Sequence, residues 1–356
     1  MIPMKVSQID TPALILEKST FEANRRTMAG LVERTGIALR PHYKSHKCPT
    51  IAKLQIADGA IGICCAKLSE AEDLADCGVE DIFIANQIVQ REKLGRLAAL
   101  AGRCRLSVCV DTAENVLALE TAMAAAGSTL YCLVEYEVGL KRCGVETHGE
   151  VLELAQLIQQ QPHLVFGGVQ AYAGNMAHEP DLSVRQSETD RIEVDLTVLR
   201  DLLNAAGLPP REIGGVSTGT VETKPSGSVY TAMQCGSYIF MDRAYGELQL
   251  GFENALFLLT TVISTKADRI VTDGGVKSLG CDQGEPLFVG FEGLPIAMSE
   301  EHGQVSAPGH GLKPGDKVRY IPGHCCTTVN VHDKIYLVDE DDVVDIWPIT
   351  SRGKSQ

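Results

Sequence analysis

Long apolar runs and basic tracts are both absent from this sequence of 356 residues. No apolar run approaches the roughly 18 residues that a transmembrane helix needs, so we expect no membrane span. Residues 1–5 also lack the apolar core of a signal peptide. Lys and Arg form no tract, and the net charge is -14. This charge argues against nucleic acids and anionic membranes as partners.

Cysteine is plentiful, with 12 residues, but it is not arranged as a disulfide framework. Cys64, Cys65, Cys109 and Cys132 lie inside apolar, strand-like runs, where reduced cysteine behaves as a small hydrophobic residue. A chain of this length can bury a core without disulfides. We therefore expect a reduced, cytoplasmic protein.

Strand-like and helix-like segments alternate from residue 39 to residue 246. The predicted strands are 39–44, 61–66, 81–85, 106–110, 130–135, 166–173, 213–218 and 237–241. Nearly continuous apolar strands, such as 82–85, are typical of a parallel sheet that helices cover. Eight such units favour an α/β fold, a TIM-like (β/α)8 barrel. A doubly wound open sheet is the alternative, although no Gly-rich dinucleotide loop follows the first strand.

Beyond residue 246 the pattern changes to short strands between Gly, Pro and Asp turns. The strand-like segments are 255–259, 262–264, 269–271, 317–321, 334–338 and 343–347. They predict a C-terminal antiparallel β domain. The strand-like segment 11–16 is a candidate member of it, because it precedes the first helix of the barrel. We predict a barrel domain over 12–246 and a β domain over 1–11 and 247–356.

Lys44 stands at the end of the first barrel strand, in Arg40-Pro41-His42-Tyr43-Lys44. In barrels of this kind, the carboxyl ends of the strands carry the active site. A lysine that is partly desolvated and close to cations has a lowered pKa and can form a Schiff base with a carbonyl. Lys44 is therefore a candidate catalytic residue, with an exposed surface lysine as the alternative.

Two turns rich in Gly, Ser and Thr follow the last two barrel strands, at 214–220 and 234–238. Small residues let backbone N–H groups approach an anion, and hydroxyl groups add further donors. Barrels often bind phosphate at the loops after strands seven and eight. The two turns together predict a ligand that carries a phosphate group.

Further polar residues are candidates for metal binding and proton transfer. His324 and Cys326 are two residues apart, so in an extended segment they would face the same side and could share an ion. Imidazole and thiolate suit Zn²⁺, although a third protein ligand is not evident. Arg142 is a candidate partner for an oxyanion, and His178 for acid or base catalysis.

Many segments resemble the family of D-threonine aldolase and D-serine dehydratase-like enzymes, which are fold type III pyridoxal phosphate (PLP) enzymes related to alanine racemase. The matching segments are 10–12, 40–47, 62–67 with 69–71, 142–145, 170–172, 218–220, 236–238 with 240–242, 301–303 and 322–333. They occur in family order along essentially the whole chain.

The resemblance implies a role for each matching position. Lys44 would be the Schiff-base lysine of pyridoxal 5'-phosphate, and His178 matches a histidine that transfers protons beside the metal. His324 and Cys326 would bind a divalent metal, Zn or Mn. A homodimer also comes with the family. The remaining cofactor-binding positions would be Arg142, Tyr172, Thr218, Gly219, Thr220, Gly236, Ser237 and Tyr238.

Cys326 departs from the aldolase pattern. Aldolases of this type usually carry Asp there, and Cys is typical of D-serine and D-threo-3-hydroxyaspartate dehydratases. The segments 170–178 and 236–242 are more similar to the aldolases. The sequence therefore predicts a PLP- and metal-dependent aldolase that cleaves a D-3-hydroxy amino acid to glycine and an aldehyde through Lys44. A metal-dependent dehydratase is the main alternative, and a racemase or a PLP-binding protein without turnover remains open.

Overall fold

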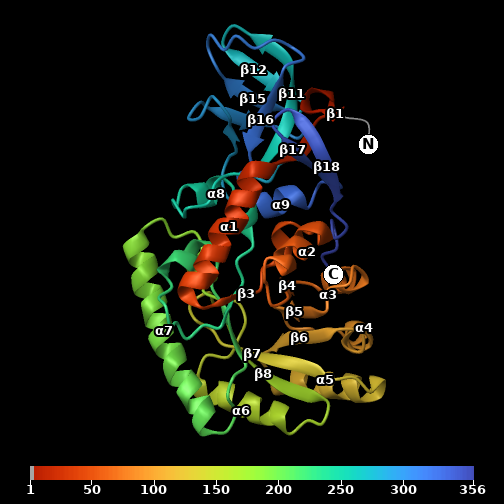
Figure 1. The fold of residues 1–356 in the computed structure, drawn as a ribbon, viewed down its shortest axis with the longest axis vertical. Helices are drawn as coiled ribbons and strands as arrows, with labels where there is room; N and C mark the ends of the chain where they lie inside the picture. Colours follow the sequence, from red (N-terminus) through yellow and green to blue (C-terminus); the bar gives the residue numbers. More distant parts are fainter. Residues whose placement is uncertain (1–3) are drawn as a thin grey trace. The chain divides into compact units, whose positions relative to one another are not determined.

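The computed structural model describes residues 4–356, and their contacts divide them into two units (Figure 1). The barrel unit consists of 29–44, 52–236 and 354–356, and the β unit of 4–28, 45–51 and 237–353. The first boundary falls inside helix α1 (Lys18–Thr35). The domain limits predicted from the sequence remain a prediction.

Eight parallel strands form the sheet of the barrel unit, in the order β3-β10-β9-β8-β7-β6-β5-β4. They are β3 (Ala38–Leu39), β4 (Ile63–Cys65), β5 (Asp81–Ile84), β6 (Arg105–Val110), β7 (Leu130–Glu135), β8 (Leu164–Ala171), β9 (Glu212–Gly215) and β10 (Ala232–Met233). Backbone hydrogen bonds of 2.9 Å, from Ile61 N to Leu39 O and from Cys64 N to Pro41 O, join the two ends of this order. The predicted barrel is confirmed.

The helices of this part of the chain follow the strands as the alternation predicts. They are α2 (Pro49–Ala57), α3 (Leu68–Asp76), α4 (Arg91–Ala101), α5 (Ala113–Ala126), α6 (His148–Gln159) and α7 (Leu182–Ala205). Side-chain caps begin three of them, because Thr112, Thr147 and Asp181 accept hydrogen bonds from the first free backbone N–H groups. Helix α7 is the longest and runs along the outside of the barrel (Figure 1).

The prediction of a strand at 237–241 is wrong. The eighth barrel strand is β10, and Ser237–Ile239 forms the short 3-10 helix η5 instead. The carbonyl of Ser237 accepts hydrogen bonds from the N–H groups of Phe240 and Met241, at 3.1 and 2.7 Å, which bends the chain into a turn. The apolar residues of this turn are buried, so their pattern imitates a strand.

The β unit contains a ten-stranded sheet in which every pairing is antiparallel except that of β2 with β17. Its strands are β1 (Met4–Lys5), β2 (Ala13–Glu17), β11 (Leu256–Lys266), β12 (Arg269–Thr272), β13 (Leu287–Phe288), β14 (Ile296–Met298), β15 (Gly303–Ser306), β16 (Lys317–Ile321), β17 (Lys334–Asp339) and β18 (Asp342–Pro348). Strand β2 lies between β11 and β17, which confirms that the N-terminal strand joins this sheet. The short helix α8 (Arg243–Gly246) precedes β11, and the short helix α9 (Cys325–Val329) connects β16 to β17.

The described residues agree with two expectations from composition. None of their helices is both long enough and apolar enough to cross a membrane. All 12 cysteines are free thiols within residues 4–356.

Candidate active site

Lys44, Arg142 and Tyr172 meet at the carboxyl end of the barrel strands. Lys44 Nζ and Arg142 Cζ each lie 6.0 Å from the centre of the Tyr172 ring. All three side chains line a pocket of about 140 Å³. Its other lining residues are His42, Ala66, Ala85, Asn86, Gln170 and Gln234. The structure thus brings together three residues that the sequence predicts for one site.

A second cavity, of about 660 Å³, is lined by most residues of the segment 136–146 and by part of α7. Arg142 borders it, but Lys44 and Tyr172 do not. We place the candidate active site in the smaller pocket, because a nucleophilic amine and a guanidinium face one aromatic ring there.

The backbone around Lys44 is held on both sides. Lys44 lies in the 3-10 helix η2 (Tyr43–Ser45) just beyond β3. The hydroxyl of the buried Tyr43 donates to Asp73 Oδ2 at 3.1 Å, and His42 N donates to Cys235 O at 3.2 Å. Lys44 N donates to His42 Nδ1 at 3.3 Å, so a neutral His42 carries its proton on Nε2. These contacts therefore fix the backbone position of Lys44 and orient the side chain of His42.

Arg142 is linked to a buried carboxylate. Its Nη2 lies 3.5 Å from Oε1 of Glu135, the last residue of β7, although the arginine side chain remains 52% exposed. Gln87 donates to Glu135 at 2.6 Å and to Asp111 at 3.1 Å. Burial raises the pKa of Glu135, and its bonds to Gln87 and Arg142 oppose that shift. Sequence reasoning missed Gln87, Asp111 and Glu135, although polar residues at the ends of three apolar strands were a usable signal.

Gln170 and Gln234 form a reciprocal amide pair that lines the pocket. Gln170 Nε2 donates to Gln234 Oε1 at 2.8 Å, and Gln234 Nε2 donates to Gln170 Oε1 at 2.6 Å. Both residues are buried, so each amide satisfies the other without water. A Cβ at Gly214 would lie 2.8 Å from Gln234 Nε2, so a side chain on the adjacent strand would displace the end of this amide. This pair was also missed, since it joins residues far apart in the sequence.

The turn after β9 packs so closely against the backbone of Ala177 that it has no room for a side chain at Gly219. It is the 3-10 helix η4 (Thr218–Thr223), and a Cβ at Gly219 would lie only 1.9 Å from Ala177 O. Ser217 N donates to Thr220 Oγ1 at 3.0 Å, so the Thr220 hydroxyl supports the turn itself. A glycine with backbone N–H groups around it suits a phosphate. In chemical type these residues fit PLP, because the Lys44 amine suits its aldehyde and the turn suits its phosphate.

The other predicted site residues of this region are placed as follows. His178 lies in the loop between η3 (Gly174–Met176) and α7. Among residues 4–356, those that line the Lys44 pocket do not include it. Gly236 is the last residue of the barrel-unit segment 52–236, and Ser237 and Tyr238 begin the next segment of the β unit. Tyr238 is buried there, with its ring 5.7 Å from that of Phe252.

His324 and Cys326 lie in the β unit, but not in an extended segment. His324 is the N-cap of α9, and Cys326 lies in the first turn of that helix, so the reasoning from an extended chain is wrong. Their side chains nevertheless form a hydrogen bond. Oδ2 of Asp282 lies 2.7 Å from His324 Nδ1, which leaves Nε2 for a metal. Burial lowers the pKa of His324, but the interactions with Cys326 and Asp282 outweigh the effect of burial and raise this pKa to about 9.

The sulfur of Cys326 is surrounded by polar groups. It lies 3.4 Å from Ser45 Oγ and 3.9 Å from Ser237 Oγ. Histidine and cysteine are the donor types that Zn²⁺ prefers, and a carboxylate on the outer nitrogen of the histidine is usual at zinc sites. Within residues 4–356, however, no group of three or more His, Cys, Asp or Glu side chains is arranged to hold an ion. The donors therefore fit a metal only if water or substrate supplies its other ligands.

Two domain families match consecutive parts of this fold. The N-terminal domain of alanine racemase matches residues 16–244. A domain described as a putative serine dehydratase domain matches residues 255–338. The first match alone spans more than half of the chain.

Relatives of known activity match along the full length. A D-threonine aldolase from Arthrobacter sp is 41% identical, covering 99% of this chain and 95% of that protein. A 3-hydroxy-D-aspartate aldolase from Paracoccus denitrificans (strain Pd 1222) is 38% identical, covering 99% and 94%. The crystal structure of D-threonine aldolase from Filomicrobium marinum superimposes with a TM-score of 0.96 at 37% identity, covering 100% of this chain and 99% of that one. The chain therefore belongs to the alanine racemase-like family of carbon–carbon lyases that includes the D-threonine and 3-hydroxy-D-aspartate aldolases.

Proposed function

We propose that this protein is a PLP- and divalent-metal-dependent aldolase that cleaves a D-3-hydroxy amino acid to glycine and an aldehyde. The observation that carries the proposal is the pocket in which Lys44 and Arg142 face one Tyr172 ring. Full-length identity of 38–41% to two aldolases supports the reaction type.

Most of the residues that would hold the cofactor belong to the barrel unit. Lys44 would bind it through the ε-amine, and Arg142 and Tyr172 would lie against its ring. Thr218 and Gly219 would donate backbone N–H groups to its phosphate, with Thr220 supporting their turn. When bound, PLP supplies an electron sink for the bond that breaks at the α carbon of the substrate. Gly236, Ser237 and Tyr238 would complete the cofactor contacts.

Two residues of the β unit would hold the metal. His324 and Cys326 would bind it, with Asp282 orienting the histidine ring. A divalent metal supplies a Lewis acid that lowers the pKa of a bound hydroxyl group. His178 would then accept the proton of the substrate 3-hydroxyl. The sulfur ligand favours Zn²⁺, whereas Mn²⁺ prefers oxygen ligands.

A dehydratase is the second candidate, because Cys326 favours it. D-threo-3-hydroxyaspartate dehydratase from Delftia sp. (strain HT23) is 25% identical over 95% of this chain. Two solved variants of that type of dehydratase replace a histidine and a cysteine two residues apart, and the cysteine variant is in a metal-free form. His324 and Cys326 have the same residue types and spacing. In this reaction Lys44 would remove the α proton, and the products would be a 2-oxo acid and ammonia.

Product identification separates the two reactions. The protein is incubated with PLP and Zn²⁺ or Mn²⁺ and, separately, with D-threonine, D-threo-3-hydroxyaspartate and D-serine. We expect glycine with an aldehyde from the first two substrates. Ammonia with a 2-oxo acid would establish the dehydratase instead. Activity that persisted in a Lys44→Ala variant would refute both.

We also propose a cytoplasmic homodimer. Sedimentation of the purified protein tests the dimer, and the free thiols of residues 4–356 are consistent with a reducing compartment. A mass corresponding to the monomer would refute the proposed dimer.

A further inference from the structure

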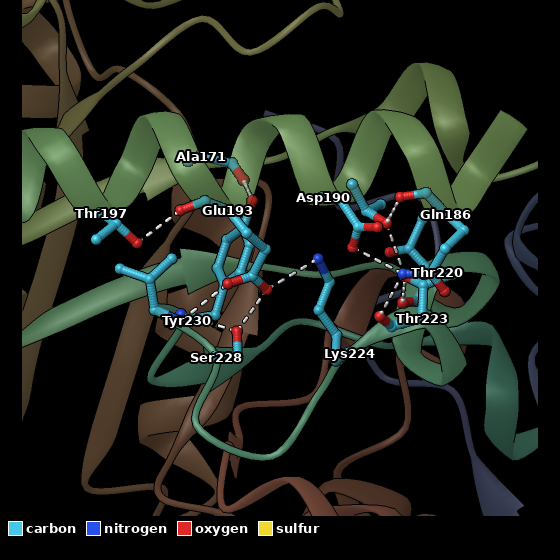
Figure 2. Close-up of polar contacts among 12 residues, drawn as sticks. Ala171, Gln186, Asp190, Glu193, Thr197, Thr220, Thr223, Lys224, Ser228 and Tyr230 are labelled. Atoms are coloured by element: carbon cyan, nitrogen blue, oxygen red, sulfur yellow. Dashed lines mark hydrogen bonds and ion pairs between the residues drawn. The ribbon is translucent and has the colours of Figure 1, made fainter.

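The carboxylate of Glu193 organises the loop that follows the candidate phosphate turn (Figure 2). Glu193 lies on α7, and its Oε1 accepts from Lys224 Nζ at 3.2 Å and from Ser228 Oγ at 2.5 Å. Its Oε2 accepts from Val229 N at 2.9 Å. One side chain therefore ties both ends of the loop 224–229 to the same helix.

Lys224 is an unusual partner for this carboxylate, because its side chain is only 2% exposed. It directly follows η4, and its backbone N–H donates to Val221 O inside that turn. Its Nζ also lies 4.8 Å from the centre of the Tyr230 ring. Burial lowers the pKa of Lys224, and the attraction of Glu193 opposes that shift. A buried ammonium group without its carboxylate would be strongly disfavoured, so the pair fixes the end of the turn.

A second attachment joins α7 to the same turn one helical turn earlier (Figure 2). Thr189 Oγ1 donates to Thr223 Oγ1 at 3.0 Å, and Gln186 Nε2 donates to Thr223 O at 3.2 Å. Thr223 Oγ1 in turn donates to Thr220 O at 2.8 Å. Since residues three or four apart share one face of a helix, 186, 189 and 193 form a row that follows η4.

The loop also reaches the wall of the pocket. The hydroxyl of Tyr230 donates to Ala171 O at 3.0 Å, immediately before Tyr172. Tyr230 is therefore in contact with both the buried Lys224 and the strand that presents Tyr172. Because the hydroxyl of Tyr230 holds the far end of the loop on the strand, loss of the Glu193–Lys224 pair would be felt mainly at the phosphate turn, which Lys224 directly follows.

We propose that the Glu193–Lys224 pair positions the phosphate-binding turn at Thr218 and Gly219, and thereby sets the affinity for a phosphorylated cofactor. The inference rests on the proposed function, because it assumes that PLP binds at this turn. A buried ion pair adds little stability over apolar residues of the same size. Its benefit here would be geometric, since it allows only one placement of η4 against α7.

The test measures cofactor affinity, without turnover. Apo-protein is titrated with PLP and with pyridoxal, which lacks the phosphate, and binding is followed by absorbance. Glu193→Gln and Lys224→Met should weaken PLP binding roughly 10- to 100-fold, by analogy with the loss of an outer contact that supports a metal ligand. Pyridoxal affinity should change little. The ³¹P resonance of bound PLP should also move in both variants.

Two controls separate positioning from a loss of stability. Glu188→Gln makes the same substitution on the same helix, but breaks only an exposed pair with Arg191, so PLP affinity should stay unchanged. The double variant Glu193→Gln/Lys224→Met leaves no unpaired charge and should fold even where a single variant does not. It should keep wild-type thermal stability more closely than Glu193→Gln while still binding PLP weakly.

The outcomes are distinguishable. Wild-type affinity for PLP in the double variant, or an equal loss for PLP and pyridoxal, would overturn the positioning role. Failure of the wild-type protein itself to bind PLP would overturn the proposed function instead.

Discussion

Replacing Gly219 by alanine tests the proposed phosphate-binding turn directly. A Cβ there would lie 1.9 Å from the carbonyl oxygen of Ala177 and 2.7 Å from its carbonyl carbon. Ordinary contact requires about 3.5 Å, so the two backbone segments would have to separate by roughly 1.5 Å. Because the opposing atoms are backbone, no side-chain rotation can relieve the clash. We expect a destabilisation of about 1–3 kcal/mol, as for other overpacked sites.

The same displacement should weaken PLP binding, since the residue that moves donates its N–H to the phosphate in our proposal. The assays are the urea midpoint of the apo-protein and a PLP titration. Gly149→Ala is a matched control, because its Cβ would meet only Thr147 Oγ1 at 3.9 Å at the start of α6. Alanine in a helix gains roughly 0.5–1 kcal/mol over glycine, so this control should not lose stability.

A Gly219→Ala protein with the wild-type midpoint and wild-type PLP affinity would refute the reasoning. It would mean that the turn can accommodate a Cβ at Gly219 despite the short distances to Ala177. Loss of stability without loss of PLP affinity would show that the phosphate does not bind at this turn, although Gly219 would still pack against Ala177.

Four further predictions follow from other parts of the chain. Arg40→Met removes a buried guanidinium that pairs with two carboxylates, and should cost about 3–5 kcal/mol in urea unfolding; a change below about 1 kcal/mol would contradict this. Lys44→Ala should remain folded by circular dichroism but lose the absorbance of bound PLP. Cys326→Ala should bind less Zn²⁺ by metal analysis, and an unchanged content would remove the proposed ligand. Burial lowers the pKa of His332, whose Nε2 is 2.8 Å from Ser278 O. The unfolded chain therefore takes up a proton at this residue at a higher pH than the folded protein does. The free energy of unfolding should decrease as pH falls from about 6.5 through that lowered pKa. The urea midpoint of His332→Gln should therefore fall less steeply over this range, and parallel profiles would show that His332 does not contribute.

The barrel was predictable because most of its strands have a recognisable local sequence pattern. Apolar runs of four to eight residues, such as β7 and β8, are followed by polar residues and capped helices. Strand β10 has only two residues, too few for any periodicity, and the buried apolar turn at 237–241 took its place in the prediction. Strands β13 to β15 were also missed, because they are short and only partly buried and so lack a continuous apolar run.

The site was predictable only in part, since its members differ in how much the local sequence constrains them. Lys44, Arg142 and Tyr172 follow strand ends, so parallel topology brings them together. The Gln170–Gln234 pair depends on the approach of two segments 64 residues apart, and no local pattern encodes it. His324 and Cys326 come together through a helix cap, which a reading of the segment as extended could not foresee.

Arg40 and Lys224 are two buried cations of the barrel unit, and their ion pairs should respond differently to substitution. Arg40 pairs with Asp81 and Glu212, the first residues of β5 and β9, which places its network at the amino ends of the strands. Polar networks there serve stability, whereas the carboxyl ends carry the chemistry. The pair of α7 is instead attached to a turn beyond the carboxyl end of β9. Arg40→Met should therefore lower the unfolding midpoint with PLP affinity preserved in the folded fraction, while loss of the α7 pair should lower affinity even where stability is restored.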